Sequence, residues 1–249
     1  MIAKGEVKTQ HSEVHAIFSD VGWEPPKVYA WLNELEKHLP FPIHRVNRGH
    51  LRNDLLSSAK NKTRLGNPPL YSRSAEGKKG MLRRVCTYEY KILPIIKQIR
   101  TLLGYQPRKK VRKGDHVEQI MGISYDEMTR MNESKLAYID HVFPLVDLKM
   151  TREDCKTWLA DHGFGEPPRS ACIGCPYRST DEWLDMRKDP ETWADAVEVD
   201  EAIREGIKGT TDQLYLHRSA TPLKDVKFEG LDDEFAVSWL DECSGLCGN

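Results

Sequence analysis

Four of the six cysteines form two closely spaced pairs. Cys172 and Cys175 are separated by two residues in the segment Ala-Cys-Ile-Gly-Cys-Pro, and Cys243 and Cys247 are separated by three residues near the end of the chain. Two thiols at this spacing on a glycine-containing turn can both reach one metal ion or cluster. The two pairs therefore indicate metal or redox chemistry.

The composition is typical of a globular protein from a reducing compartment. No apolar run approaches the ~18 to 20 residues that a bilayer requires, and the first ten residues lack the apolar core of a signal peptide. We therefore expect a cytoplasmic protein with no membrane partner. In that compartment thiols are more often metal ligands or catalytic groups than structural disulfides.

The net charge of −1 conceals two basic clusters that flank the segment around Cys86. The first consists of Lys78, Lys79, Arg83 and Arg84, and the second of Arg108, Lys109, Lys110, Arg112 and Lys113. Such clusters most often lie in solvent-exposed loops without a specific ligand. Both clusters also suit an anionic ligand such as phosphate or sulfate.

The hydrophobic pattern of the first half predicts an α/β fold. A short apolar strand at residues 14–18 is followed by a helix that begins at Pro25 or Pro26 and is stopped by Pro40. Residues 43–46 then predict a second strand, which completes the strand–helix–strand unit of parallel sheets. Residues 57–80 are polar and show no periodicity, so we expect a long loop there.

The second half continues the alternation and then changes character. We expect a helix from Cys86 to about Leu103, a strand at 117–123, a short helix at 126–130, a strand that includes 143–148, a helix capped by Thr151, and two helical stretches at 181–187 and 191–205. The tail from Thr210 is rich in loops. We expect one domain over residues 1–165 and a cysteine-containing C-terminal extension over 166–249 that packs on it.

Several segments, taken in order, resemble the phosphoadenosine phosphosulfate (PAPS) reductase family of the adenine nucleotide α-hydrolase (PP-loop ATP pyrophosphatase) superfamily. These segments are residues 17–24, 84–87, 91–94, 122–130, 144–147, 172–176 and 242–248. The resemblance implies a Rossmann-like, HUP-type parallel sheet flanked by helices. It also implies a bound adenine nucleotide, with an iron–sulfur cluster next to the reactive end of that nucleotide.

The resemblance further implies cluster ligands. Family members that contain a cluster use a Cys-Cys pair ahead of a Lys-x-x-Pro segment and a later Cys-x-x-Cys. Here Cys86 matches the first of these positions, but Thr87 stands at the second and cannot replace a thiolate. The fourth ligand must come from Cys155, Cys243 or Cys247, and Cys155 is alternatively a buried small hydrophobe. The predicted metal ligands are Cys86, Cys155, Cys172 and Cys175, holding a 4Fe-4S cluster or, alternatively, zinc.

The resemblance and the charges together predict catalytic and binding residues. The family places a nucleophilic cysteine after a glutamate near its C-terminus, and Glu242-Cys243 resembles this arrangement. Cys243 and Cys247 are therefore predicted to be catalytic, unless the pair serves as metal ligands. The predicted nucleotide and anion contacts are Phe18, Asp20, Arg84, Lys91, Arg130 and Arg218. Arg130 alternatively pairs with the acids of its own helix.

One family feature has no counterpart in this sequence. The Ser-Gly-Gly-x-x-Ser phosphate loop should precede the segment around Asp20, yet only about a dozen residues precede the strand at Val14, and none form a glycine-rich run. Either the sequence is truncated or it is a variant that has lost this loop. Without the phosphate loop, nucleotide hydrolysis by this polypeptide is not expected, whereas a truncated sequence would leave it possible for the full-length protein.

Three functions fit these observations. The first is an oxidoreductase similar to PAPS reductase, in which a thiolate attacks the sulfur of an adenylyl sulfate and a thiol reductant such as thioredoxin completes the release of sulfite. The second is an ATP-dependent sulfurtransferase of the same superfamily, whose basic loops contact a nucleic acid. The third is a non-catalytic metal-binding protein.

Overall fold

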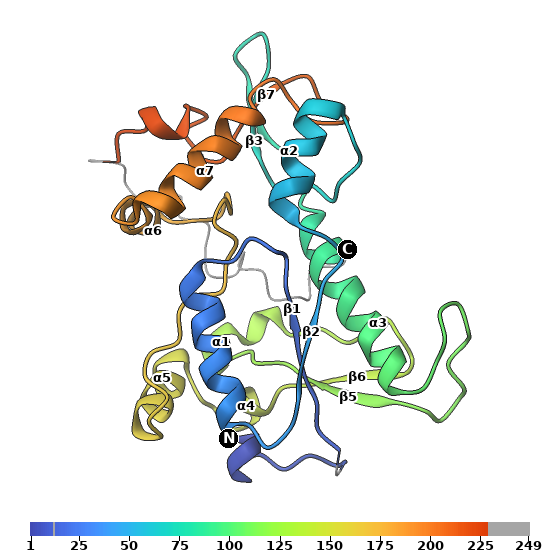
Figure 1. Ribbon diagram of the computed structural model, residues 1–249. Coiled ribbons are helices and arrows are strands. Elements are labelled where there is room, and N and C mark those ends of the chain that lie inside the picture. Colours follow the sequence, from blue (N-terminus) through green and yellow to red (C-terminus); the bar gives the residue numbers. More distant parts are fainter. Residues whose placement is uncertain (12, 229–249) are drawn as a thin grey trace. The chain divides into compact units, whose positions relative to one another are not determined.

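The computed structural model describes residues 1–11 and 13–228, which form two compact units (Figure 1). Unit 1 comprises Met1–Ser19, Pro26–Val46 and Leu93–Arg169. Unit 2 comprises Asp20–Pro25, Asn47–Ile92 and the described residues from Ser170 onward. Each unit is therefore assembled from segments that are distant in the sequence.

Unit 1 is built on two pairs of parallel strands. Strand β1 (Ala16–Ser19) pairs with β2 (Ile43–Val46), and helix α1 (Pro26–His38) connects them. Strand β5 (Val117–Ile120) pairs with β6 (Ile139–Val142). Parallel strands joined through a helix are the defining unit of α/β folds. The expected α/β class is confirmed at this level.

The helices of unit 1 begin where local sequence favours them. Thr151 accepts a hydrogen bond from the Asp154 backbone N–H (3.2 Å), and the Asp154 carboxylate accepts one from the Thr151 backbone N–H (2.8 Å). This capping box starts α5 as predicted. The helices are η1 (Ile2–Lys4), α3 (Leu93–Leu102), η3 (Tyr125–Arg130), α4 (Pro144–Asp147) and α5 (Arg152–Asp161). Helix α3 contacts β1 and β2.

Unit 2 combines a small antiparallel sheet with helices. The sheet has the order β4 (Lys79–Met81), β3 (Tyr71–Arg73), β7 (Gln213–Tyr215). The helices are α2 (Leu51–Asn61), the π-helix η2 (Thr87–Ile92), α6 (Thr180–Met186), α7 (Pro190–Ala202) and η4 (Leu223–Asp225). None of the helices in the described part of the chain is long and apolar enough to cross a bilayer.

One apolar core holds unit 2 together. Leu55 of α2, Val199 of α7 and Leu214 of β7 have no measurable exposure and belong to the same buried cluster. Burying a side chain of this size stabilises the fold by about 1.5 to 3 kcal/mol. Cys86 and Cys172 pack against this cluster from its edge. The core therefore supports the residues that carry the predicted chemistry.

Two expected elements were wrong. The predicted loop at residues 57–80 contains the end of α2 and the β3–β4 hairpin. Strands β3 and β4 have three residues each, and β3 also pairs with β7, which lies far along the sequence. The strand predicted to include 143–148 ends earlier, as β6, and Pro144 starts helix α4 instead, because proline favours the first turn of a helix.

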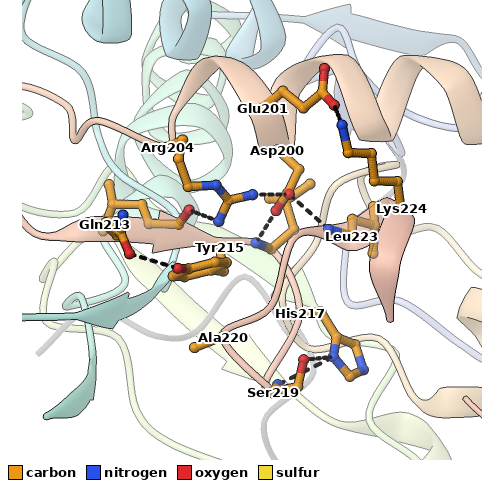
Figure 2. Close-up of polar contacts among 12 residues, drawn as sticks. Asp200, Glu201, Arg204, Gln213, Tyr215, His217, Ser219, Ala220, Leu223 and Lys224 are labelled. Atoms are coloured by element: carbon orange, nitrogen blue, oxygen red, sulfur yellow. Dashed lines mark hydrogen bonds and ion pairs between the residues drawn. The ribbon is translucent and has the colours of Figure 1, made fainter. Parts of the chain in front are cut away.

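A buried carboxylate on α7 fixes the segment that follows it (Figure 2). Asp200 accepts hydrogen bonds from the backbone N–H groups of Leu216 (2.8 Å) and Leu223 (2.9 Å), and it forms an ion pair with Arg204. Arg204 also donates to the Leu214 carbonyl (2.7 Å). One side chain thereby satisfies two backbone donors and a guanidinium in the interior.

Replacing this carboxylate should destabilise unit 2 strongly. Asp200→Ala leaves two buried N–H groups without their acceptor and the half-buried Arg204 guanidinium without its carboxylate partner, which costs about 3 to 5 kcal/mol. Urea-induced unfolding measures the loss. Glu201→Ala is the matched control, because Glu201 is exposed and pairs with Lys224 on the surface (2.7 Å). Similar unfolding midpoints for the two variants would contradict this role of Asp200.

Candidate functional site

The Cys172–Cys175 loop is closed by its own backbone and by one arginine. The backbone N–H of Cys175 donates to the Cys172 carbonyl (3.0 Å). Arg178 donates through Nε to the Ile173 carbonyl (3.0 Å) and through Nη2 to the carbonyls of Ala171 (3.0 Å) and Cys172 (2.9 Å). Three carbonyls therefore share one guanidinium, which fixes the path of the loop.

A tryptophan supports the other side of this loop. The Ile173 backbone N–H donates to the Trp23 carbonyl (2.8 Å), and a Cβ atom at Gly174 would lie 2.2 Å from Cη2 of Trp23. Only glycine fits against the indole ring at this distance. Trp23 is itself buried and donates through Nε1 to Asp195 of α7 (2.5 Å). The loop therefore rests on a ring that cannot move easily.

The thiol of Cys86 shares the surroundings of the Cys172 thiol. The backbone N–H of Cys86 donates to the Asn67 carbonyl (3.1 Å), immediately before η2 begins. Burial raises the pKa of Cys172 well above its ordinary value, Lys91 opposes this shift, and the thiols of Cys175 and Cys86 add to it. Cys86 and Cys172 also pack against the same apolar core, and electrostatic influence weakens with distance, so the three predicted ligands lie in one neighbourhood.

A buried ion pair lies beside these thiols. Lys91 Nζ lies 3.8 Å from Glu24 Oε1, and Ser170 Oγ donates to Glu24 Oε2 (3.2 Å). Glu24 is 3% exposed; burial raises its pKa, while Lys91 lowers it. Both groups also act on the Cys172 thiol. The cation predicted to bind an anion is therefore next to the predicted metal ligands.

Three further predicted contacts belong to the same unit. The guanidinium of Arg84 lies 5.2 Å from the ring centre of Tyr177, two residues after Cys175. Asp20 accepts a hydrogen bond from the Gly22 backbone N–H (2.7 Å). Arg218 donates to Thr180 Oγ1 at the start of α6 (3.2 Å). Unit 2 thus contains Cys86, Cys172, Cys175, Asp20, Arg84, Lys91 and Arg218.

Burial makes the residue before Arg218 an unsuitable proton donor near neutral pH. His217 is 2% exposed, and its Nδ1 lies 2.8 Å from Ser219 Oγ. Burial, with a smaller effect of Arg218, lowers the pKa of His217 to about 4. The imidazole is therefore neutral at pH 7, and its role is that of a core residue.

The remaining predicted residues lie elsewhere. Phe18 is in β1, Arg130 is in η3 and pairs with Glu127 (2.9 Å), and Cys155 is in α5, so all three belong to unit 1. Burial raises the pKa of Cys155, and the nearby carboxylates of Asp154 and Asp126 add to this. Cys243 and Cys247 lie outside the described residues. The predicted roles of these residues stay predictions.

The thiols of unit 2 do not by themselves complete a metal site. Within residues 1–11 and 13–228, no group of three or more His, Cys, Asp or Glu side chains is arranged to hold a metal ion. Cys86, Cys172 and Cys175 are therefore not arranged here as a three-thiolate group, and a tetrahedral site would require a fourth donor besides them. Two of the candidate fourth ligands, Cys243 and Cys247, lie outside the described residues.

Sequence reasoning missed the side chains that shape the site. Arg178 was not predicted, and Trp23 and Glu24 appeared only as part of a resembling segment. Gly174, between the two cysteines, was the one local signal of close packing. A pocket of about 720 Å³ in unit 1 is lined by the N-terminal segment and residues 40–42, and none of the predicted site residues lines it.

Comparison with family models, with curated proteins and with solved structures finds no match to this chain. The resemblance to PAPS reductases therefore rests on the sequence motifs alone.

Gly174 offers a test of the loop's packing. Gly174→Ala forces the Trp23 ring or the cysteine loop to shift, which should destabilise the protein by about 1 to 3 kcal/mol. Gly122→Ala is the control, because a Cβ atom there meets nothing within 4 Å and the backbone is ordinary. Urea unfolding followed by tryptophan fluorescence compares the two. Equal stability of the Gly174 and Gly122 variants would mean that the loop does not rest on Trp23.

Proposed function

We propose that this chain is an iron–sulfur protein similar to PAPS reductase that acts on an adenylyl sulfate or a related nucleotide. The observation that carries the proposal is that Cys86 shares one neighbourhood with Cys172 and Cys175, next to the Lys91–Glu24 ion pair. These cysteines come from two segments that are distant in the sequence. Thiols gathered in this way are typical of a shared inorganic centre.

The donor set is suited to a sulfur-ligated centre. Cys86, Cys172 and Cys175 would hold three of its positions, and Cys155, Cys243 or Cys247 would provide the fourth. A 4Fe-4S cluster is the proposed occupant and zinc is the alternative, since both accept four thiolates. When bound, a cluster would supply a fixed redox centre beside the substrate.

The cations of unit 2 would hold the anionic end of the nucleotide. Lys91 lies next to the Cys172 thiol, and Arg84 lies over the ring of Tyr177. Arginine presents a planar set of donors that matches sulfate and phosphate oxygens, whereas lysine acts as a point charge. Arg218 and Asp20 would complete the contacts. The parallel strands of unit 1 would by themselves belong to a HUP-type nucleotide fold, and the roles of Phe18 and Arg130 in that unit stay predictions.

The chemistry would be a two-step thiol reaction. The Cys243 thiolate attacks the sulfur of the adenylyl sulfate, forming an S–S bond and breaking the S–O bond to the nucleotide phosphate, which leaves with the electron pair. The Cys247 thiolate then attacks Sγ of Cys243, releasing sulfite and forming a disulfide. A thiol reductant such as thioredoxin would restore both thiols.

The proposed cofactor predicts a coloured, iron-containing protein. Anaerobically purified protein should absorb visible light and contain roughly four iron atoms per chain. Cys86→Ser, Cys172→Ser and Cys175→Ser should each lose most of this iron. Thr87→Ser is the control and should keep it, because Thr87 is not proposed as a ligand. A colourless protein with one zinc per chain would rule out the iron–sulfur cluster. Iron content measured in Cys155→Ser, Cys243→Ser and Cys247→Ser identifies the fourth ligand as the cysteine whose loss also removes iron.

The proposed reaction predicts sulfite release. Cluster-loaded protein supplied with a dithiol reductant should release sulfite from adenylyl sulfate or its 3′-phosphorylated form. Lys91→Ala should lower kcat/KM by roughly 100-fold, because it removes a cation that faces developing negative charge, while Lys91→Arg should keep more of the activity. Fully loaded protein that releases no sulfite from either substrate would contradict the reductase assignment.

A sulfurtransferase acting on a nucleic acid is the second candidate function. The observation that favours it is the exposed positive charge around the β3–β4 hairpin, where Lys78 and Lys79 are both exposed. An adenylyl sulfate needs only a few cations at one point. A surface of cations extending beyond the cysteine site is more typical of proteins that contact a phosphate backbone.

A further inference from the structure

The positive charge of unit 2 is concentrated in one stretch of the chain. Residues 47–92 contain eleven lysines and arginines but only three acids, although the whole protein has a net charge of −1. Two of these acids are engaged internally. Glu89 is 4% exposed and pairs with Arg48 (2.9 Å) and Arg64 (2.5 Å), and Asp54 accepts a hydrogen bond from the Tyr90 hydroxyl (2.5 Å). Among the three acids only Glu76 is exposed.

Seven cations of this stretch are exposed: Arg48, and six that lie between the end of α2 and the start of η2. These six are Lys60, Lys62, Arg64, Lys78, Lys79 and Arg83. Lys62 Nζ donates to the carbonyl of Gly206 (3.0 Å), shortly before the β7 strand that pairs with the hairpin. The side-chain amide of Asn67 donates to the Arg83 carbonyl (3.5 Å). In Figure 1 the end of α2 and the tip of the β3–β4 hairpin both lie at the upper end of unit 2.

The same stretch of the chain also exposes two large side chains. Met81, at the end of β4, is 44% exposed, and Tyr88, in η2, is 45% exposed. Tyr88 directly precedes Glu89, which pairs with Arg64. Exposed aromatic rings set between cations provide stacking platforms for bases while the cations contact phosphates.

We propose that this basic face, defined by the six cations together with Met81 and Tyr88, binds single-stranded nucleic acid. Charge complementarity selects a polyanion, and the exposed Tyr88 ring selects one with unpaired bases, since the bases of a duplex are stacked on one another. Tyr88 is two residues after Cys86, so a bound strand would pass the cysteine site. This binding proposal does not depend on the proposed reductase activity. If the protein is instead a sulfurtransferase, single-stranded nucleic acid would be its substrate class.

A binding assay without any nucleotide chemistry tests this surface. Fluorescence anisotropy with single-stranded RNA and DNA oligonucleotides of about 20 nucleotides should show an affinity that falls with salt, with a log–log slope near −3 if about four phosphates are neutralised. The combined variant Lys60→Glu, Lys78→Glu and Lys79→Glu should weaken binding by roughly 100-fold. Tyr88→Ala should weaken it by roughly tenfold.

A second basic cluster provides the matched control. Lys109→Glu, Lys110→Glu and Lys113→Glu change the charge by the same amount on exposed residues of unit 1, and their Kd should stay within about threefold of the wild type. Equal losses in the two triple variants would overturn the proposal. So would salt-insensitive or absent binding by the wild-type protein, or binding of duplex that is equally tight and unaffected by Tyr88→Ala. Sulfite release plays no part in these outcomes, so the two proposals fail separately.

Discussion

The guanidinium of Arg178 holds together the loop on which the candidate site depends. It donates to the carbonyls of Ala171, Cys172 and Ile173, so a turn with few contacts of its own gains a fixed shape. The side chain is 8% exposed and lies 6.0 Å from the ring centre of Trp183. Without this cation all three carbonyls would lose their bond to the guanidinium, and the loop that carries Cys172 and Cys175 would lose this restraint.

The loop is rigid because its support reaches deep into unit 2. Trp23 packs on Gly174 and donates to Asp195, and Asp195 also pairs with Arg52 of α2. One short path of contacts therefore joins the cysteine loop to α7 and α2. Sites on such supported elements hold their geometry better than sites on free loops. The buried Lys91–Glu24 pair adds charge to this frame close to the thiols.

Local patterns predicted much of unit 1 and little of the sheet in unit 2. The β1–α1–β2 unit and the capping box at Thr151 follow from periodicity and from residues within one turn of each other. Strands β3 and β4 were not predicted from the sequence, because a strand of three residues shows no periodic pattern and because their partner β7 comes from far along the chain. Likewise, spacing identified Cys172 and Cys175, whereas Arg178 and Trp23 matter through contacts that only the folded chain reveals.

The central claim is that Cys86 and the Cys172–Cys175 loop share one neighbourhood. Chemical cross-linking of the metal-free Cys175→Ser protein with a short bifunctional thiol reagent, followed by peptide mass spectrometry, tests it most directly. The account predicts that the peptides containing Cys86 and Cys172 are recovered joined. Recovery of the two cysteines on separate peptides, each alkylated alone, would contradict it.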